Sequence, residues 1–557
     1  MPVHFDEDAQ KRRAAEFRLQ EAERFAGMIA HNSGLQYTDL SLVSINPDAL
    51  GLVEEPAARA AKLAVFREAG KTIDVAVFSP SMPGVAEILA KLKESGYIVT
   101  LYITTDESLE RAWKFYADLQ KIKETKVGQI DISAESIGQY IEKINTLEDS
   151  KLLIMDILKG SGAAKVTAML EAILASAIAL ETSDIHLEPE EHMVRARFRL
   201  DGVLHEIASF EHHIYRLLLA RIKLLSSLKL NVASTRQDGR FSVDFGKSGI
   251  DIRASIIPGG YGEAIVMRLL NPESVKVPLE KLGMSPQVLK IMQTEIDKPN
   301  GMILNTGPTG SGKTTTLYTF LQEANDPGVK IITIEDPIEY QIEGLVQTQV
   351  NAEKGYTFFE GLKSAMRQDP DLIMVGEIRD GETANTAIDA ALTGHLVFST
   401  LHTNNAAGTI PRLIDLGVNP KVIGPAMNVA MAQRLVRVLC QKCKTEGPIT
   451  EEEKVIIGKR ITSLAEIDVH LTLPEKLARP VGCVTCNNTG YKGRVGIYEI
   501  ILVDKSIEEI IATNPSEFEV MQVARKQKIP DMTEDGILKV LDGRTTIEEL
   551  QRVVDLA

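Results

Sequence analysis

The sequence predicts a multi-domain α/β protein, and three observations carry this prediction. Short apolar runs typical of buried parallel strands recur between residues 301 and 403, and each ends in polar residues. A glycine-rich turn joins the first of these runs to a helical segment. Before residue 280, strand-like and helix-like segments alternate in two further stretches. The 557 residues are enough for about three or four domains of ordinary size.

The composition is that of a globular protein, with 44% hydrophobic and 25% charged residues. The formal net charge is −15, from 62 basic and 77 acidic residues. This balance argues against a nucleic-acid partner, because phosphate binding needs a concentrated basic face. The chain has no run of about 18 apolar residues, as a membrane-spanning helix requires, and its charged start does not resemble a signal peptide. We therefore expect a cytoplasmic protein that reaches a membrane only through partners.

The glycine-rich turn, GPTGSGKT at residues 307–314, has the full pattern G-x-x-x-x-G-K-[ST]. Its glycines let backbone N–H groups surround phosphate oxygens, Lys313 can reach the β- and γ-phosphates, and the Thr314 hydroxyl can hold Mg²⁺. An apolar run precedes the turn and a helical segment follows it, which is the context the motif needs. The predicted nucleotide-binding residues of this loop are Gly307, Pro308, Thr309, Gly310, Ser311, Gly312, Lys313, Thr314 and Thr315.

Three more apolar runs, within residues 331–340, 369–380 and 393–403, deliver polar side chains where the predicted strands end. Ligands bind at the carboxyl ends of the strands in an open parallel sheet. ATP hydrolysis needs a positioned water, a group that activates or orients it, Mg²⁺ and positive charge at the γ-phosphate. Three carboxylates are candidates for the activating group. The polar residues of these three runs are Glu335, Asp336, Glu339, Glu377, His395 and His402.

These segments resemble the aspartate box, the Walker B strand and the histidine box of the secretion ATPase superfamily. Within that superfamily, the chain is most similar to the type II secretion and type IV pilus assembly ATPases. The resemblance implies a RecA-like P-loop core over residues 276–435, a PAS-like α/β domain before it, and ATP with Mg²⁺ as ligands. It also implies a homohexameric motor at the inner face of the cytoplasmic membrane, acting on an inner-membrane platform protein.

Residue by residue, the resemblance implies a role for each polar group of the core. Glu339 is the water-activating carboxylate, and Glu377 holds Mg²⁺ together with Thr314. Glu335 and Asp336 orient the site. Both histidines act near the γ-phosphate. Two further arginines, which tie the site to a subunit interface, are Arg367 and Arg412.

Residues 1–120 are expected to form a small α/β domain behind a polar N-terminal arm. Strands at residues 74–78 and 98–103 flank an amphipathic helix at residues 83–95. The resemblance makes this the domain that docks on a membrane-anchored partner, and a purely structural appendage is the alternative. Residues 121–164 are expected to be a linker with bridging helices.

Residues 165–275 are expected to form a second α/β domain whose strands carry many arginines. The segment at residues 193–200, MVRARFRL, alternates apolar and basic residues, as a half-exposed strand does. Arginines on strands are usually solvated, but six on one small sheet are more than solubility requires. The resemblance implies that this domain covers the nucleotide site of a neighbouring subunit, with Arg253 and Arg268 reaching the phosphates. The six arginines are Arg195, Arg197, Arg199, Arg240, Arg253 and Arg268.

All four cysteines fall within residues 436–495, as two C-x₂-C pairs. This pattern indicates a structural tetrahedral Zn²⁺ site, because four thiolates fill the coordination sphere. Disulfides and a redox dithiol are the alternatives. The intervening residues 444–479 are expected to be mostly helical and to form a docking lobe for the platform protein, and residues 496–557 to be helical. The cysteines are Cys440, Cys443, Cys483 and Cys486.

The function expected from the sequence is therefore a hexameric ATPase that drives pilus assembly or type II secretion. Two alternatives belong to other classes. A DNA translocase or conjugation-type motor would share the P-loop, but it would need basic loops that the acidic balance disfavours. A nucleotide-binding scaffold would bind ATP tightly and hydrolyse little of it.

Overall fold

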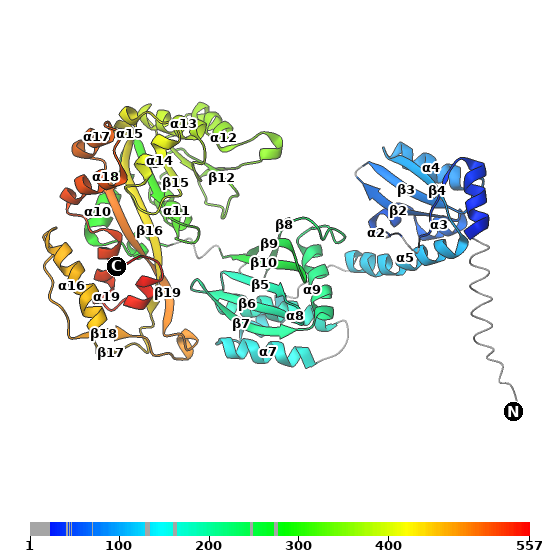
Figure 1. The fold of residues 1–557 in the computed structure, drawn as a ribbon, viewed down its shortest axis with the longest axis horizontal. Coiled ribbons are helices and arrows are strands. Elements are labelled where there is room, and N and C mark those ends of the chain that lie inside the picture. Colours follow the sequence, from blue (N-terminus) through cyan, green and yellow to red (C-terminus); the bar gives the residue numbers. More distant parts are fainter. Residues whose placement is uncertain are drawn as a thin grey trace. The chain divides into compact units, whose positions relative to one another are not determined.

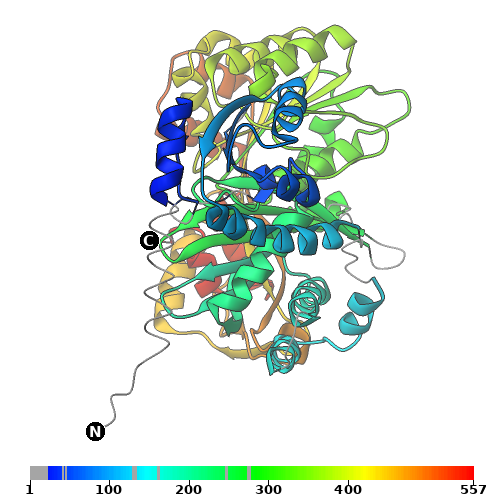
Figure 2. The same cartoon turned by 90° about the vertical axis from the view of Figure 1, so that its right-hand side faces the viewer.

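The computed structural model describes residues 23–40, 43, 45, 47–69, 71–127, 134–159, 164–244, 249–271 and 277–556. The predicted polar N-terminal arm and parts of the predicted linker lie outside the described residues. The chain divides into two compact units, residues 1–131 and residues 132–557. Figures 1 and 2 show the elements of both units from two directions.

The first unit is built on a four-stranded sheet with the strand order β1-β4-β3-β2. Strands β3 and β4 pair in parallel and α4 connects them, which is the βαβ unit that the alternating segments predicted. The indole N–H of Trp113, on α5, donates to the carbonyl oxygen of Leu63 at 3.0 Å and fixes that helix on the sheet. The elements are β1 (Gln36–Tyr37), α2 (Pro47–Leu50), α3 (Glu55–Ala60), β2 (Leu63–Ala69), β3 (Thr72–Val77), α4 (Val85–Glu94), β4 (Ile98–Ile103) and α5 (Asp106–Val127).

The second unit begins with a six-stranded antiparallel sheet in the order β7-β6-β5-β10-β9-β8. Burial alternates along β6, so its apolar residues face the core while Arg195, Arg197 and Arg199 lie on the other face, as the sequence predicted. Helices α8 and α9 complete the core, and α6 and α7 pack on α8. The elements are α6 (Ala134–Ile141), α7 (Leu147–Lys159), α8 (Ala164–Ala179), β5 (Asp184–Pro189), β6 (Val194–Leu200), β7 (Val203–Phe210), α9 (His212–Leu225), β8 (Gln237–Asp244), β9 (Gly249–Gly259) and β10 (Gly262–Leu270).

A seven-stranded sheet in the order β13-β12-β14-β15-β11-β16-β19 forms the rest of this unit. Its neighbouring strands run parallel, except that β19 is antiparallel to β16. Strands β11, β12, β14 and β15 are buried along their whole length, which explains why their sequences read as apolar runs. The strands are β11 (Gly301–Thr306), β12 (Ile331–Glu335), β13 (Val346–Gln349), β14 (Leu372–Val375), β15 (Leu396–Leu401), β16 (Met427–Leu439) and β19 (Tyr491–Leu502).

Helices cover both faces of this sheet and form two separate cores. Met302 and Leu304 of β11 belong to one core and Ile303 to the other, because successive side chains of a strand point to opposite faces. The first core includes α12, α13 and α15, and the second includes α10 and α11. These helices are α10 (Pro286–Ile296), α11 (Lys313–Glu323), α12 (Phe358–Ala365), α13 (Gly381–Leu392), α14 (Thr409–Asp415) and α15 (Pro420–Ala426).

Strands β16 and β19 form a long ribbon that leaves the sheet and ends at the cysteines (Figure 1). Cys440 directly follows β16, and Cys486 ends a short 3-10 helix shortly before β19. The interval 444–479 contains one helix, α16, but also the paired strands β17 and β18, which corrects the mostly helical expectation. The elements here are β17 (Thr445–Pro448), α16 (Glu451–Ala465) and β18 (Lys476–Arg479).

Residues 496–502 belong to β19, which corrects the expected start of the helical C-terminal segment; the helices begin at Lys505 and pack against the first core. Each of these helices has a side chain at the N-cap that accepts a backbone N–H, which defines where the helix begins. Among the described residues, no helix combines the length and the apolar character that a membrane crossing needs. The helices are α17 (Lys505–Ile511), α18 (Glu517–Ala524), α19 (Met532–Leu541) and α20 (Ile547–Gln551).

Candidate active site

Four parallel strands end at the same edge of the seven-stranded sheet. The glycine-rich loop follows β11, the Glu339-bearing loop follows β12, Glu377 follows β14, and His402 follows β15. The register places β11, β14 and β15 side by side, with β12 next to β14. The structure therefore brings together most of the polar groups that the sequence predicted at strand ends.

The backbone of the glycine-rich loop takes conformations that only glycine adopts easily. Gly307, Gly310 and Gly312 have φ angles of 151°, 80° and 91°. A Cβ atom on Gly307 would lie 2.6 Å from the carbonyl oxygen of Gln433. Helix α11 starts directly after Gly312. Among the described residues around this helix start, no side chain accepts a hydrogen bond from its first N–H groups. The N–H groups of its first turn are thus available to an anion, which fits the predicted phosphate site.

Lys313 is the cation of this loop. Its Nζ donates to the carbonyl oxygens of Gly307 at 2.6 Å and Pro308 at 3.2 Å. Burial lowers the pKa of Lys313, and the charge of Arg434 lowers it further, while Glu377 opposes both. Arg434 lies on β16, more than 100 residues after the loop, and sequence reasoning missed it because an arginine on a strand carries no signal of its own.

Glu377 is held by two basic side chains. His402 Nε2 lies 3.4 Å from Glu377 Oε2, and Arg379 forms an ion pair with Glu377 and lies 3.7 Å from Asp336. Burial works against ionisation of Glu377, but hydrogen bonds and charge from Arg379 and His402 keep its pKa below the ordinary value. An ionised carboxylate beside the loop, with the exposed Thr314 at the start of α11, fits a Mg²⁺ ion held by oxygen ligands and water.

Glu339 contacts the arginine-bearing sheet of its own chain. Arg253 Nη1 donates to Glu339 Oε2 at 2.8 Å, and the same guanidinium also bonds the carbonyl oxygen of Ile338. Arg268 lies nearby, with its Nε bonded to Asp184 Oδ1 at 3.0 Å. The resemblance had placed these arginines at the site of a neighbouring subunit. In this structure the Arg253 contact is made within one chain.

The other two acidic residues after β12 differ in environment. Glu335 is 4% exposed, and both of its carboxylate oxygens accept hydrogen bonds from neighbouring side chains. Asp336 is partly exposed and faces Arg379. Glu335 is therefore engaged in the fold, which leaves Glu339 and Glu377 as the carboxylates that can act on a bound nucleotide.

Three predicted residues are not brought to this edge. His395 precedes β15, so it lies at the opposite end of the strand from His402, about 20 Å away for six residues at about 3.3 Å each. Its Nδ1 is 3.0 Å from the carbonyl oxygen of Ala390. The structure places His402 at the nucleotide edge and His395 at the other end of β15, and the role of His395 near the γ-phosphate stays a prediction. Arg367 and Arg412 are exposed on the short helix Met366–Gln368 and on α14.

The four cysteines form a compact cluster whose sulfur atoms lie within 4.8 Å of one another. The Sγ–Sγ distances are 3.9 Å for Cys440–Cys483 and 3.8 Å for both Cys443–Cys486 and Cys483–Cys486. These distances exceed the disulfide length of about 2.05 Å. Four sulfurs bound tetrahedrally at about 2.3 Å from one Zn²⁺ would be about 3.8 Å apart. The donor set and its spacing fit the predicted zinc site.

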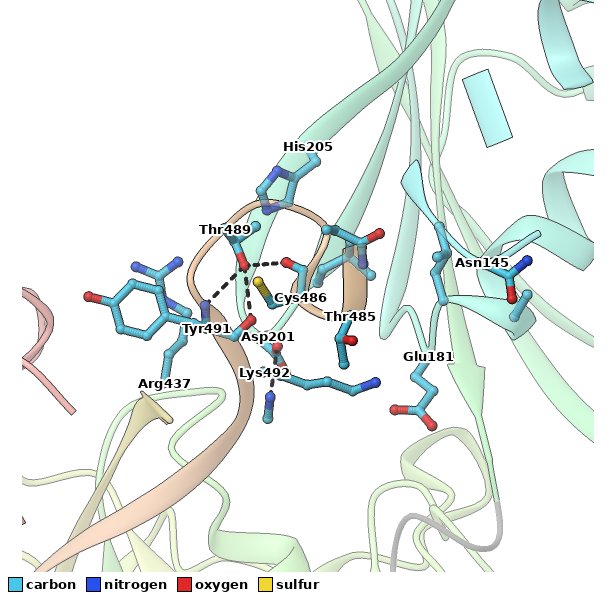
Figure 3. Close-up of a pocket in the computed structure, with 15 residues that line it drawn as sticks. Asn145, Glu181, Asp201, His205, Arg437, Thr485, Cys486, Thr489, Tyr491 and Lys492 are labelled. Atoms are coloured by element: carbon cyan, nitrogen blue, oxygen red, sulfur yellow. Dashed lines mark hydrogen bonds between the residues drawn. The ribbon is translucent and has the colours of Figure 1, made fainter. Parts of the chain in front are cut away.

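A polar cavity of about 130 Å³ lies beside this cluster rather than at the glycine-rich loop (Figure 3). Two of its charged groups, Arg437 and Asp201, are already engaged. Arg437 donates to Glu549 at 2.9 and 2.6 Å, and Asp201 accepts the N–H of Gly493 at 3.0 Å. Near it, the N–H of Leu147, at the start of α7, donates to Asn487 Oδ1 at 2.9 Å. The start of β19 therefore bonds the β6–β7 turn through Gly493, and the cysteine loop bonds the start of α7 through Asn487.

The loop after His402 depends on a carboxylate with an unusual pKa. Glu499 accepts the N–H of Ala406 at 2.8 Å, and desolvation by the surrounding protein raises its pKa from 4.5 to about 7. The carboxyl group of Glu499 thus holds its proton more tightly in the folded state than in the unfolded state. Raising the pH from 4.5 to 7 therefore lowers the stability of the folded state, by at most about 3.5 kcal/mol in total at about 1.4 kcal/mol for each pH unit.

We expect Glu499→Gln to remove this pH dependence, because glutamine can accept the same N–H without ionising. From pH 5 to pH 8, the thermal unfolding midpoint of the wild type should fall relative to that of the variant. Glu509→Gln, an exposed change on α17, is the matched control and should follow the wild type. Parallel curves for wild type and Glu499→Gln would contradict the prediction.

Comparisons with known proteins agree with this geometry. The family model described as "Type II/IV secretion system protein" matches residues 159–552. The chain is 44% identical to "Type II secretion system protein E" of Aeromonas hydrophila over 72% of this chain and 77% of that protein. It is 35% identical to "Type IV pilus assembly ATPase PilB" of Myxococcus xanthus over 95% of this chain and 91% of that protein. The match to a solved structure of the ATPase DotB from Yersinia pseudotuberculosis covers 70% of this chain and 94% of that chain, with a TM-score of 0.50 and 23% identity. This likeness concerns the fold alone. The chain belongs to the type II/IV secretion system protein family.

Proposed function

We propose that this protein is a motor ATPase that drives assembly of a type IV pilus or of a type II secretion pseudopilus. One observation carries the proposal. The glycine-rich loop, Glu339, Glu377 and His402 meet at one sheet edge, and Arg253 from the preceding sheet of the same chain reaches Glu339. The names of the relatives from Aeromonas hydrophila and Myxococcus xanthus support the secretion and pilus assignments.

The binding roles follow from the geometry. Lys313 and the N–H groups of the loop bind the phosphates of ATP. Glu377 and Thr314 hold Mg²⁺, which neutralises charge on the phosphates when it is bound. Asp336 faces Arg379 and orients that edge of the site. His402 touches Glu377 and is placed to respond to the γ-phosphate.

The remaining groups act on the reaction itself. Glu339 accepts a proton from, or orients, the attacking water. Arg253 and Arg268 supply positive charge to the nucleotide bound by their own chain, in place of the neighbour's site first expected. In the structure Arg253 is paired with Glu339, so ATP binding would redirect this guanidinium toward the phosphates and free the carboxylate.

The motor works as a homohexamer at the inner face of the cytoplasmic membrane. Cycles of ATP binding and hydrolysis move the arginine-bearing domain against the core and so act on an inner-membrane platform protein. The N-terminal α/β unit docks on a membrane-anchored partner, and a structural Zn²⁺ is held by the four cysteines. Contact with the membrane is made through these partners only. Family membership over residues 159–552 supports the motor assignment, and the spacing of the four cysteine sulfurs supports the metal.

ATP turnover by the purified protein tests this function, with Lys313→Ala as the inactive variant. Removing the ammonium should lower turnover by about 10²-fold or more, as loss of a preorganised charge at the reacting group does. Lys290→Ala, an exposed lysine on α10, is the matched control and should keep wild-type turnover. Stimulation by the cytoplasmic part of a platform protein supports the motor, and stimulation by DNA instead would point to a translocase. A wild type that binds ATP without turnover, even with its platform partner, would point to a scaffold.

A further inference from the structure

Glu335 stands where a catalytic carboxylate could be, at the end of β12, but its surroundings give it another task. Tyr318 donates its hydroxyl proton to one carboxylate oxygen. Thr333 Oγ1, at 2.5 Å, and Gln347 Nε2, at 3.1 Å, both donate to the other. Glu335 is 4% exposed, and its three side-chain donors are neutral groups. A buried carboxylate that accepts three hydrogen bonds in this way fixes its donors in place.

Gln347, on β13, connects this carboxylate to the loop that carries Glu339. Its Nε2 also donates to the carbonyl oxygen of Tyr340 at 2.9 Å. Its Oε1 accepts the N–H of Ile342 at 2.7 Å. One amide side chain therefore bonds the loop at two backbone positions, one and three residues after Glu339, and ties both to Glu335.

Tyr318 connects the same carboxylate to the nucleotide loop. It lies on α11, five residues after Lys313, and is fully buried. Burial and the neighbouring charge of Glu335 raise the pKa of its phenol, so it remains a hydrogen-bond donor. The Tyr318 ring also packs edge-on against Tyr340, with ring centroids 6.4 Å apart. The helix that starts at the phosphates and the loop that carries Glu339 thus share one buried anchor.

We propose that Tyr318, Glu335 and Gln347 are positioning residues that hold Glu339 at a fixed place relative to the glycine-rich loop. The inference rests on the proposed ATPase function and on Glu339 as the group that acts on water. None of the three needs to touch the nucleotide. Their effect on hydrolysis comes through the loop of residues 336–345, because a displacement of about 1 Å at a reacting group can lower a rate about 10²-fold.

Gln347→Met tests this role, since methionine has a similar length but neither donates nor accepts these bonds. The turnover number should fall about 10- to 100-fold while the dissociation constant for ATP stays at its wild-type value. The backbone N–H of Ile342 loses its acceptor, so hydrogen exchange in the peptide that contains it should accelerate. Gln349→Met makes the same change on the same strand at an exposed side chain, and it should alter neither quantity.

Tyr318→Phe supplies a second test that keeps the buried ring. It should also lower turnover with ATP affinity retained. The double variant should lose less than the product of the two single losses, because both side chains act through one carboxylate.

The outcomes separate this inference from the proposed function. Normal turnover in Gln347→Met, beside a Glu339→Gln variant that has lost it, overturns the positioning role and leaves the ATPase intact. A fall in ATP affinity that accounts for the whole effect of Gln347→Met also overturns it. A wild-type protein without turnover overturns both.

Discussion

Glu339→Gln is expected to bind ATP as the wild type does and to lose about 10²-fold or more of its turnover. Removing a group that takes a proton in the transition state typically costs that much. Glutamine keeps the size of the side chain and can still accept the hydrogen bond that Arg253 donates, so the contact between the two domains should persist. Steady-state hydrolysis and equilibrium nucleotide binding, measured on the same preparations, check both parts.

The matched control is Glu343→Gln, the same change at an exposed residue of the same loop. It should hydrolyse ATP at the wild-type rate. A companion variant, Glu377→Gln, should instead raise the Mg²⁺ concentration needed for half-maximal turnover, since Glu377 is assigned to the metal. If Glu339→Gln keeps wild-type turnover and Glu377→Gln loses it at saturating Mg²⁺, the two assignments are reversed.

Loss of the zinc site is the second change with a large expected effect. Structural zinc sites contribute about 10–16 kcal/mol of apparent binding free energy in small zinc-binding peptides, and that energy stabilises the fold. Cys443→Ser or treatment with a strong chelator should therefore unfold the segment around the cysteines. Because Asn487 accepts the N–H of Leu147, the first turn of α7 should lose protection in hydrogen exchange at the same time.

Val484→Ala is the control for this experiment. Val484 lies between two cysteines of the cluster and is 64% exposed, so its truncation should leave the site intact. Metal analysis should give one zinc per chain for wild type and Val484→Ala, and less for Cys443→Ser. A wild-type chain that carries no metal, and whose exchange pattern is unaffected by chelation, would contradict the zinc assignment.

The sequence predicted the central strands of the core well because both of their faces are buried. Strands β11, β12, β14 and β15 contain short apolar runs, and few other structures produce that pattern. It did not predict that residues 491–502 pair with residues 427–439, because antiparallel pairing across more than 50 residues leaves no local periodicity. The strands β17 and β18, four residues each, were missed for a similar reason. A segment such as Thr445–Pro448, with a glycine and a proline, does not resemble a strand.

The candidate site was predictable where a reactive or charged side chain directly follows a predicted strand. Lys313, Glu339, Glu377 and His402 all follow the carboxyl end of a strand, and the structure brings them to one edge. The sequence also indicates that His395 and His402 lie at opposite ends of one strand, and a role for both near the γ-phosphate came from the resemblance alone. Glu335 was predicted as a residue that orients the site, but Tyr318 and Gln347 were missed because they lie inside elements, where polar side chains are common. Arg379 could have been found, since it lies two residues after Glu377.

The ribbon of β16 and β19 connects the nucleotide loop to the cysteine cluster. Near its middle, β16 places Gln433 and Arg434 against the glycines of the nucleotide loop, and its C-terminal end runs directly into Cys440. The residues from Gln433 to Leu439, at about 3.3 Å each, span about 23 Å between the nucleotide loop and the cysteines. A hydrogen-bonded pair of strands resists bending more than a single extended chain, and the cysteine cluster lies at the far end of this pair. A small tilt of β16 beside the phosphates would therefore displace the cysteine cluster by more than it displaces Gln433, because the cluster lies farther from the sheet.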